Sequence, residues 1–379
     1  MKNWTGKPGY PVVKARMLKE RINFSQSRFF ASPISARKTK NTTKWEIPIN
    51  FKQNKVNFGE AGFFRTVYSK ELLERLREPI RNKKLSAQDR LGVIRDLFSL
   101  AEAGTIPTTD ALGFLSAYKK EDNYTVWLEI VTGVSRIEQL LAGKSKNLDK
   151  LIINLFSPIL KHLGWNSKKK ELHADTLLRS LTISRLGRSR DEKVLSKARA
   201  FIKKKHLDPN IRGAVYATVA SSGTLADFKK FIAKYKKETL HEEKNRIGGA
   251  LGDFPNPKIL KLACEFAFSK NVRIQDTVSI ISSVGANPMG RDIWWNFVQK
   301  NWKTLVSRYG EGGHTLARLI KVIGGSAEGK HLKSFKKFFK THDAPGAKRA
   351  VDQVLERLEG NVAWLKRDGK KIEKFLETS

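Results

Sequence analysis

The chain has 379 residues, of which 73 are Lys or Arg and 37 are Asp or Glu, so its formal net charge is +36. Hydrophobic residues make up 40% of the sequence, which allows sizeable cores and excludes wholesale disorder. Cys264 is the single cysteine, which excludes an internal disulfide and a cysteine-based zinc ribbon. The most apolar run, residues 151–160, is too short to span a membrane, and the first residues lack the apolar segment of a signal peptide. We therefore expect a soluble, cytoplasmic protein of two or three domains.

The positive charge is densest near the N-terminus. Residues 1–57 contain 13 basic and 2 acidic side chains, whereas the lysine runs at 168–170, 203–205 and 336–337 are short and scattered. No helix-turn-helix pattern and no RNP-type aromatic motif accompanies these runs. Dispersed lysine is typical of a solvated surface, so we expect nucleic acid to bind only non-specifically.

Residues 9–68 predict short β-strands. Three runs rich in β-branched and aromatic residues carry this prediction, and turn-prone residues at 32–33 and 40–42 separate them. The runs are Tyr10–Val13, Arg21–Phe24 and Trp45–Ile49. A last extended stretch from Val56 to Tyr68 contains Gly59 and Gly62, which indicate a bulge or a close backbone approach.

From about residue 69 the apolar pattern takes the period of helices. Ser86 and Asp89 form a predicted capping box before a helix with apolar positions from 91 to 101, and Gly104 predicts its end. Further helices are predicted around 175–185, 191–204, 212–219, 225–235 and 246–251, with Pro209, Pro255 and Pro257 at their connections. Short helices joined by Gly and Pro turns favour a stacked α-solenoid, although no fixed-period repeat is present.

Motifs for catalysis are missing from the sequence. The closest approach to a metallopeptidase helix starts at His241-Glu242, but Asn245 stands where the second imidazole would be needed. There is no G-x-S-x-G elbow and no phosphate-binding G-x-x-x-x-G-K-[ST] loop. Cys264 lies in an apolar helical stretch and is interpreted as a buried structural thiol. By its own residues the chain is not an enzyme and holds no metal or cofactor.

Several segments, taken in order, resemble the C-terminal part of the zinc aminopeptidase family that includes puromycin-sensitive aminopeptidase, aminopeptidase A and the tricorn-interacting factors. The matching segments of the β region are Trp4 with Gly9–Val13, Ser25–Phe29, Trp45–Ile49 and Asn57–Tyr68. Those of the helical region are Asp89–Leu91 with Asp96, Ala101–Gly104, Tyr124–Trp127, Leu178–Arg179, Leu186–Gly187, Val272–Asp276, Asn287–Arg291, Trp295 and Asn301–Trp302. Glu60 and Phe64 replace the family's usual Gln and Tyr.

The resemblance implies a mainly α-helical protein: a HEAT- or armadillo-like superhelical bowl over residues 69–379, preceded by a shortened β-sandwich hinge over residues 1–68. In relatives this bowl caps the catalytic cleft, while the G-x-M-E-N loop and the zinc-binding H-E-x-x-H helix lie upstream of the position of Trp4. Neither motif is present here. The resemblance therefore implies a non-catalytic region, which is one subunit of a split enzyme, a truncated product or an excised domain. Its expected partners are a peptide substrate and, in the case of a split enzyme, a separate catalytic subunit that carries the zinc.

The resemblance also singles out individual residues. Arg318 is similar to a family arginine near the peptide, and we expect it to contact a peptide carboxylate; the alternative is that it covers apolar surface or pairs with a nearby Asp. The remaining family-motif residues are interpreted as structural, with Arg65 in an ion pair and Arg273 paired with Asp276. They are Arg65, Tyr68, Arg273, Asp276, Asn287, Arg291 and Trp302.

Two other hypotheses stay open at this point. The chain could be a free-standing basic α-solenoid that binds an acidic protein or nucleic acid. It could also be an intact peptidase with dispersed metal ligands, but the seven histidines never come within five residues of one another, which argues against it.

Overall fold

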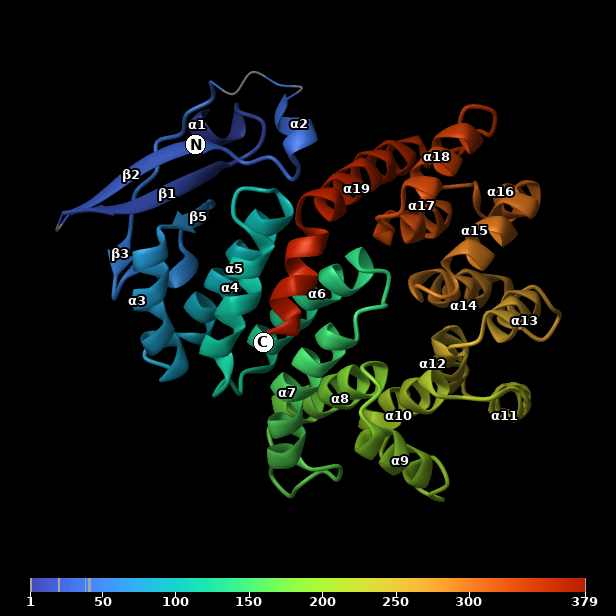
Figure 1. Ribbon diagram of the computed structural model, residues 1–379. Helices are drawn as coiled ribbons and strands as arrows, with labels where there is room; N and C mark the ends of the chain where they lie inside the picture. The colour runs from blue at the N-terminus through green and yellow to red at the C-terminus, as the bar shows by residue number, and fades with distance from the viewer. Residues whose placement is uncertain (1, 20, 38, 40–41, 379) are drawn as a thin grey trace. The chain divides into compact units, whose positions relative to one another are not determined.

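The computed structural model describes all residues except 1, 20, 38, 40–41 and 379 (Figure 1), so the predicted turn at 40–42 falls largely outside the described residues. The chain is mainly helical, with a small sheet near its N-terminus. It divides into two compact units, which we treat separately. Unit 1 comprises residues 1–135 and 366–378, and unit 2 comprises residues 136–365.

The sheet of unit 1 is built from three strands in the order β2-β1-β5. β1 (Pro11–Leu18) pairs antiparallel with β2 (Arg21–Arg28) and parallel with β5 (Arg65–Tyr68). β3 (Phe51–Lys52) and β4 (Lys55–Val56) form a separate two-stranded hairpin. The strands predicted near residues 10–13 and 21–24 are therefore confirmed. The extended stretch from Val56 is interrupted by the short 3-10 helix η1 (Phe58–Glu60), where Gly59 adopts a φ of 74°.

The strand predicted at Trp45–Ile49 is wrong, because this segment has no regular structure. It is held beside β2 by one side chain: the Gln26 amide donates to the Trp45 carbonyl at 2.7 Å and accepts from the Trp45 amide at 2.8 Å. Pro48 has no N–H to donate to a neighbouring strand. The short helix α2 (Pro33–Arg37) lies in the region for which only strands were predicted, and another, α1 (Lys2–Thr5), precedes that region.

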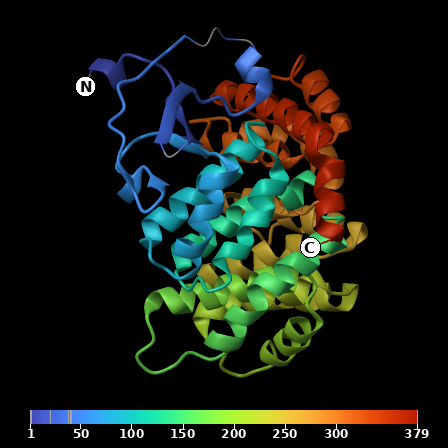
Figure 2. The ribbon, with the colours of Figure 1, turned by 60° about the vertical axis from the view of Figure 1, so that its left-hand side comes forward.

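The helices of unit 1 pack beside this sheet, with α3 and α4 against β1 and β5 (Figure 2). The unit contains α3 (Lys70–Arg81), α4 (Ala87–Glu102), α5 (Thr108–Phe114), η2 (Leu115–Tyr118), most of α6 (Tyr124–Leu140) and the end of α19 (Lys348–Glu377). Strands give way to helices between residues 68 and 70, as predicted. The compact units do not follow this change, since their boundary crosses α6 and α19.

The start of α4 is only half of the predicted capping box. The Ser86 hydroxyl accepts from the Asp89 amide at 3.1 Å, as expected for an N-cap. The buried Asp89 carboxylate returns to the Ser86 hydroxyl, at 2.7 Å, and not to the Ser86 amide, and its other oxygen accepts the Gly59 amide at 2.6 Å. It thereby fixes η1 against α4. Gly104, with a φ of 73°, follows the end of the helix where predicted.

Unit 2 is entirely helical in its described residues. Besides the end of α6 and the larger part of α19, it contains α7 (Lys146–Leu163), α8 (His173–Arg188), α9 (Glu192–Phe201), α10 (Pro209–Ser221), α11 (Leu225–Lys237), α12 (His241–Ala250), η3 (Leu251–Asp253), α13 (Pro257–Ala267), α14 (Ile274–Ala286), α15 (Arg291–Lys300), α16 (Trp302–Tyr309), α17 (His314–Lys321), η4 (Val322–Gly325) and α18 (Gly329–Phe338). The helices predicted between 175 and 251 are all confirmed.

Alternate helices of unit 2 pack on one another. Helix α8 contacts α10, α10 contacts α12, α12 contacts α14, and α14 contacts α17. Helices α9, α11 and α13 pack against this series (Figure 1). Side-chain N-caps from Asp191, Asp208 and Asn256 begin three of these short helices.

Candidate functional site

Arg65 lies in the polar core of unit 1, where strand β5 crosses helix α4. Its guanidinium lies 3.0 Å from the Asp96 carboxylate and donates to the Tyr10 hydroxyl at 3.2 Å. The other Asp96 oxygen accepts the Thr66 amide at 2.8 Å. Burial raises the pKa of Asp96 to about 6, although the charge of Arg65 acts in the opposite direction. The Arg65–Asp96 pair thereby links strand β5 to helix α4.

Tyr68, three residues further along β5, joins this strand to the β3–β4 hairpin. Its hydroxyl donates to the Val56 carbonyl at 3.2 Å and accepts the Val56 amide at 3.1 Å. Burial raises the Tyr68 pKa well above its ordinary value, so the phenol stays protonated and can keep both bonds. The hydroxyl satisfies two backbone groups of a strand that is only two residues long.

Two further buried ion pairs of unit 1 were missed from the sequence. Arg90 makes a two-point contact with Glu121, at 2.6 and 2.8 Å, and Lys55 lies 2.6 Å from Glu60. Arg90 belongs to the Asp89–Leu91 motif, and this position was the signal in the sequence that could have indicated the Arg90–Glu121 pair. Its partner, 31 residues away, carries no local signal.

Arg273 and Asp276 form the local pair that we expected at the start of α14. The Arg273 Nε lies 2.7 Å from one Asp276 oxygen, and a terminal nitrogen lies 3.2 Å from the other. Asp276 lies in the first turn of the helix, where a carboxylate also interacts favourably with the helix dipole. The pair requires no ligand to explain it.

Asn287 and Trp302 hold loop backbone in unit 2. The Asn287 amide donates to the carbonyls of Gly252 and Phe254, at 2.8 and 3.0 Å, and thereby fixes the end of α14 to the η3 region. The Trp302 indole N–H donates to the Asp343 carbonyl at 3.1 Å. Both residues thus donate to backbone carbonyls of neighbouring segments.

Arg291, at the start of α15, differs from the other family-motif residues. Only 2% of it is exposed, yet its Nε has no hydrogen-bond partner among the described residues. Burial lowers the Arg291 pKa, although the negative charges of Glu328 and Asp292 act in the opposite direction. Its predicted structural role stays a prediction.

Arg318 lies on the exposed side of α17. Leu316, Leu319 and Ile320 form the buried face of this helix, as the spacing predicts, and Ile323 continues that face into η4. No hydrogen bond or ion pair joins the Arg318 side chain to another residue in the described ranges. Its guanidinium is therefore accessible to a ligand.

A chain of hydrogen bonds in unit 2, from the buried Ser326 to the exposed Asp292, has the connectivity of a Ser-His-Asp triad. The Ser326 hydroxyl lies 2.7 Å from the His331 Nδ1, and the His331 Nε2 lies 2.6 Å from the Asp292 carboxylate. Ser326 is fully buried, however, and its oxygen already accepts the Glu328 amide at 3.1 Å. A substrate cannot reach this hydroxyl, so the chain of bonds fixes the start of α18 and does not serve catalysis.

The same neighbourhood is unsuitable for a metal ion. Potential ligand atoms of Asp292, Glu328 and His331 lie within 4.8 Å of one another, and no other such group occurs in the described part of the chain. The Lys330 ammonium group already lies 2.6 Å from Asp292 and 3.6 Å from Glu328. Its positive charge offsets part of the negative charge that would attract a cation, and it occupies the space between the two carboxylates. His241, the histidine of the partial metallopeptidase motif, lies exposed at the start of α12.

Cys264 is fully buried within α13. Burial raises its thiol pKa to about 12, so the sulfur stays protonated. This confirms its interpretation as a structural residue, since the thiolate is the nucleophilic form.

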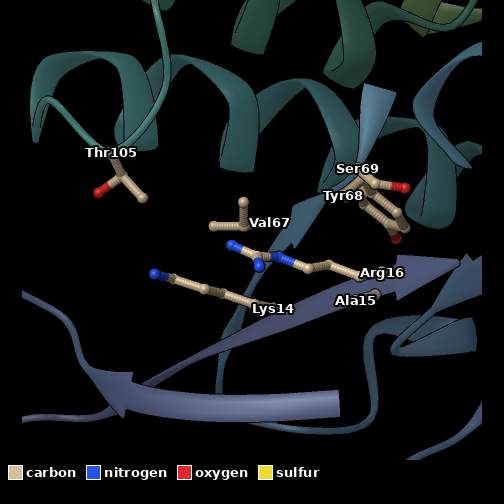
Figure 3. A pocket seen from close by; sticks show the side chains of 7 residues that line it. All are labelled: Lys14, Ala15, Arg16, Val67, Tyr68, Ser69 and Thr105. Carbon is tan, nitrogen blue, oxygen red and sulfur yellow. The ribbon is translucent and has the colours of Figure 1, made fainter. Parts of the chain in front are cut away.

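A small basic pocket opens beside the sheet of unit 1 (Figure 3). Its volume is about 200 Å³, and it is lined by Lys14 and Arg16 of β1 together with Val67, Ser69 and Thr105. Figure 3 shows both basic side chains extending alongside one another toward Thr105. Neither forms an ion pair with a residue that the structure describes. The chemistry of this lining favours a small anion over a cation.

The structure thus defines a mainly helical protein with a small sheet near its N-terminus. Comparison with known families matches residues 54–360 to the ERAP1-like C-terminal domain. The chain belongs to this family.

The curated relatives carry the names of aminopeptidases. Aminopeptidase M1-A of Oryza sativa subsp. japonica is 27% identical over 413 residues, covering 96% of this chain and 46% of the relative. Aminopeptidase 2 of Candida albicans is 25% identical, covering 99% and 45%, and glutamyl aminopeptidase of Bitis rhinoceros is 26% identical, covering 100% and 44%. The chain spans less than half the length of these relatives.

No helix in the described ranges has both the length and the apolar composition needed to cross a lipid bilayer.

Proposed function

We propose that this chain is the non-catalytic C-terminal region of a zinc aminopeptidase, which encloses the active-site cleft and contacts the peptide substrate. Membership of the ERAP1-like C-terminal domain family and the aminopeptidase names of the relatives support this proposal. The zinc and the bond-breaking chemistry belong to a catalytic part that carries G-x-M-E-N and H-E-x-x-H, motifs that this sequence lacks.

The alternating contacts of α8, α10, α12 and α14 support a superhelical, HEAT-like arrangement of unit 2. Such an arrangement has an inner layer of helices that presents side chains to an extended ligand. In this proposal the inner layer faces the peptide, and the zinc-binding catalytic part provides the rest of the cleft.

Arg318 is the residue that we propose contacts the peptide. The observation that carries the proposal is its exposed guanidinium, which is paired with none of the residues that the structure describes. Buried leucine and isoleucine side chains anchor α17, so the position of Arg318 is fixed at its backbone. A guanidinium can bind a carboxylate through two parallel N–H donors. A partly desolvated contact of this kind contributes about 1.5–3 kcal/mol, or roughly tenfold to 150-fold in affinity.

The test measures binding of one peptide as its free acid and as its C-terminal amide, to the chain alone and to the chain combined with its catalytic half. The free acid should bind wild type about tenfold or more tightly than the amide, and Arg318→Ala should abolish this difference. Lys321→Ala, which removes another exposed cation from α17, is the matched control and should preserve it. The chain alone should hydrolyse no aminoacyl-coumarin substrate. Equal binding of acid and amide to wild type contradicts the role of Arg318.

The alternative function, a free-standing basic helical protein that binds nucleic acid or an acidic protein, rests on the net charge of +36. Duplex DNA distinguishes the two proposals. If the charge is a general surface property, binding should show no sequence preference and should weaken steeply between about 50 and 200 mM salt. Sequence-selective binding that persists at 150 mM salt favours the alternative.

A further inference from the structure

An apolar groove lies between helices α11 and α13 of unit 2. It has a volume of about 360 Å³ and is lined by Leu225, Phe228, Lys229, Ile232, Leu262, Glu265 and Phe266. Leu225 is 46% exposed and Leu262 is 40% exposed, so two large apolar side chains, one from each helix, face solvent. We call this surface the α11–α13 groove.

The helical period explains why these side chains are left outside the core. Phe228, Phe231 and Tyr235 form the buried face of α11 and pack against the aromatic rings of Phe254 and Phe266. Leu225 and Ile232 lie seven residues apart, on a second stripe of the same helix. Because of this stripe, the apolar face of α11 is wider than the surface that packs against the core, and the stripe stays uncovered.

On α13 the corresponding residues are Leu262 and Phe266, four residues apart on one side of the helix. Phe266 packs edge-on against Tyr235 of α11, with ring centroids 5.3 Å apart. The two apolar stripes are thereby held on neighbouring helices, and the nearly buried Phe228 contributes to the lining between them. The result is a concave apolar surface with a fixed lining.

The helices that form the groove are strongly basic. Together α11 and α13 contain seven lysines and two acidic residues, a net charge of +5. Lys229 lines the groove, Lys236 follows Ile232 by one turn, and Lys258 precedes Leu262 by one turn. None of these three lysines is paired with an acidic side chain that the structure describes.

We propose that the α11–α13 groove binds an acidic amphipathic helix of a partner protein. The apolar lining fits leucine-like anchors at helical spacing, in the helix-in-groove mode of peptide recognition, and the lysines fit acidic residues beside those anchors. A bilayer is a poorer fit, because a flat membrane surface cannot reach the nearly buried Phe228 of a concave groove. The site is independent of Arg318, so it stands or fails separately from the proposed function.

The experiment uses the full chain and two labelled peptides of about 18 residues, ~27 Å long as helices. One peptide carries leucines at i, i+3, i+4 and i+7 with glutamate elsewhere, and the other has the same composition with its leucines spread around the helix. Fluorescence anisotropy at about 150 mM salt should show at least tenfold tighter binding of the first peptide. The doubly substituted variant Leu225→Glu/Leu262→Glu should lose most of this difference.

Matched variants separate the groove from general charge. Lys229→Glu/Lys258→Glu should weaken binding by about tenfold, whereas Lys193→Glu/Lys197→Glu on α9 changes the net charge equally and should have less than about twofold effect. Leu172→Glu, at another exposed leucine, should leave binding unchanged. Circular dichroism melting verifies that each variant is folded.

Two results would overturn the proposal. One is equal binding of both peptides, or binding by Leu225→Glu/Leu262→Glu that equals wild type. The other is that the chain binds vesicles containing phosphatidylserine through the same leucines while the amphipathic peptide does not compete, which assigns the groove to a membrane surface.

Discussion

Charged residues around α4 in unit 1 differ in their pairing from those on α11 and α17 in unit 2. Around α4, Arg65 and Arg90 are each joined to a buried carboxylate at 3.0 Å or less. On α11 and α17, Lys229 and Arg318 are exposed and unpaired with any residue that the structure describes. Both regions contribute to the same basic composition, but only the second leaves its cations accessible.

The difference shows how burial separates structural charges from binding charges. A buried ion requires a partner, because leaving water is costly unless another charge or hydrogen bonds compensate for it. A cation on the surface is solvated by water and needs no partner in the protein. Its charge and its N–H donors are therefore available to a ligand. Family-motif residues such as Arg65 belong to the first class, and we therefore expect their substitution to affect stability before it affects binding.

The largest expected effect comes from breaking a pair of the first class. Glu121→Ala leaves the buried Arg90 guanidinium without its two-point partner and also removes the acceptor of the Asp122 and Asn123 amides. The free energy of unfolding should fall by about 3–5 kcal/mol, measured by urea denaturation at pH 7.

The control for this variant is Glu74→Ala, which breaks an exposed pair with Arg77 on α3. That loss should be below about 1 kcal/mol. Equal losses in the two variants would contradict the distinction between buried and exposed charges.

A smaller effect is expected at Asp149 on α7, a half-buried carboxyl in unit 2. Burial and the neighbouring charge of Glu138 raise the pKa of Asp149 to about 6. The folded state then holds this proton more tightly than the unfolded state, so the contribution of Asp149 to stability falls as the pH rises through the interval from about 4 to 6. Asp149→Asn removes this titration.

The variant should therefore gain stability relative to wild type as the pH rises from 4 to 7. We expect a change of about 1 kcal/mol in the difference between their free energies of unfolding, after allowance for partial exposure. Urea denaturation of both proteins at pH 4.5, 5.5 and 7 measures it. A difference that is constant, or that changes in the opposite direction, rules out a raised pKa at Asp149.

The helices were predictable from the sequence because their determinants are local: caps such as Ser86 and Asp191, the stop at Gly104, and apolar spacing such as that of α17. The segment at Trp45–Ile49 was not, because its place depends on the Gln26 side chain, 19 residues away.

Candidate-site residues divide in the same way. The Arg273–Asp276 pair could be predicted because it spans one helical turn, whereas the partner of Arg90 lies 31 residues away. The α11–α13 groove was missed for a related reason. Apolar spacing on one helix indicates an apolar face but does not say how much of it another helix will cover.

The smallest expected change in stability is at Arg318, where two neighbouring residues of α17 provide the comparison. Arg318 is exposed and unpaired with the described residues, whereas Leu319 is fully buried. Arg318→Ala should alter the free energy of unfolding by no more than about 0.5 kcal/mol, because an exposed substitution removes neither packing nor a buried pair. Leu319→Ala should lose about 2–5 kcal/mol, because it leaves a cavity in the core. Thermal and urea denaturation of the two variants measure both values. A loss above about 1 kcal/mol in Arg318→Ala would mean that this arginine supports the fold, and any effect on peptide binding would then follow from altered structure.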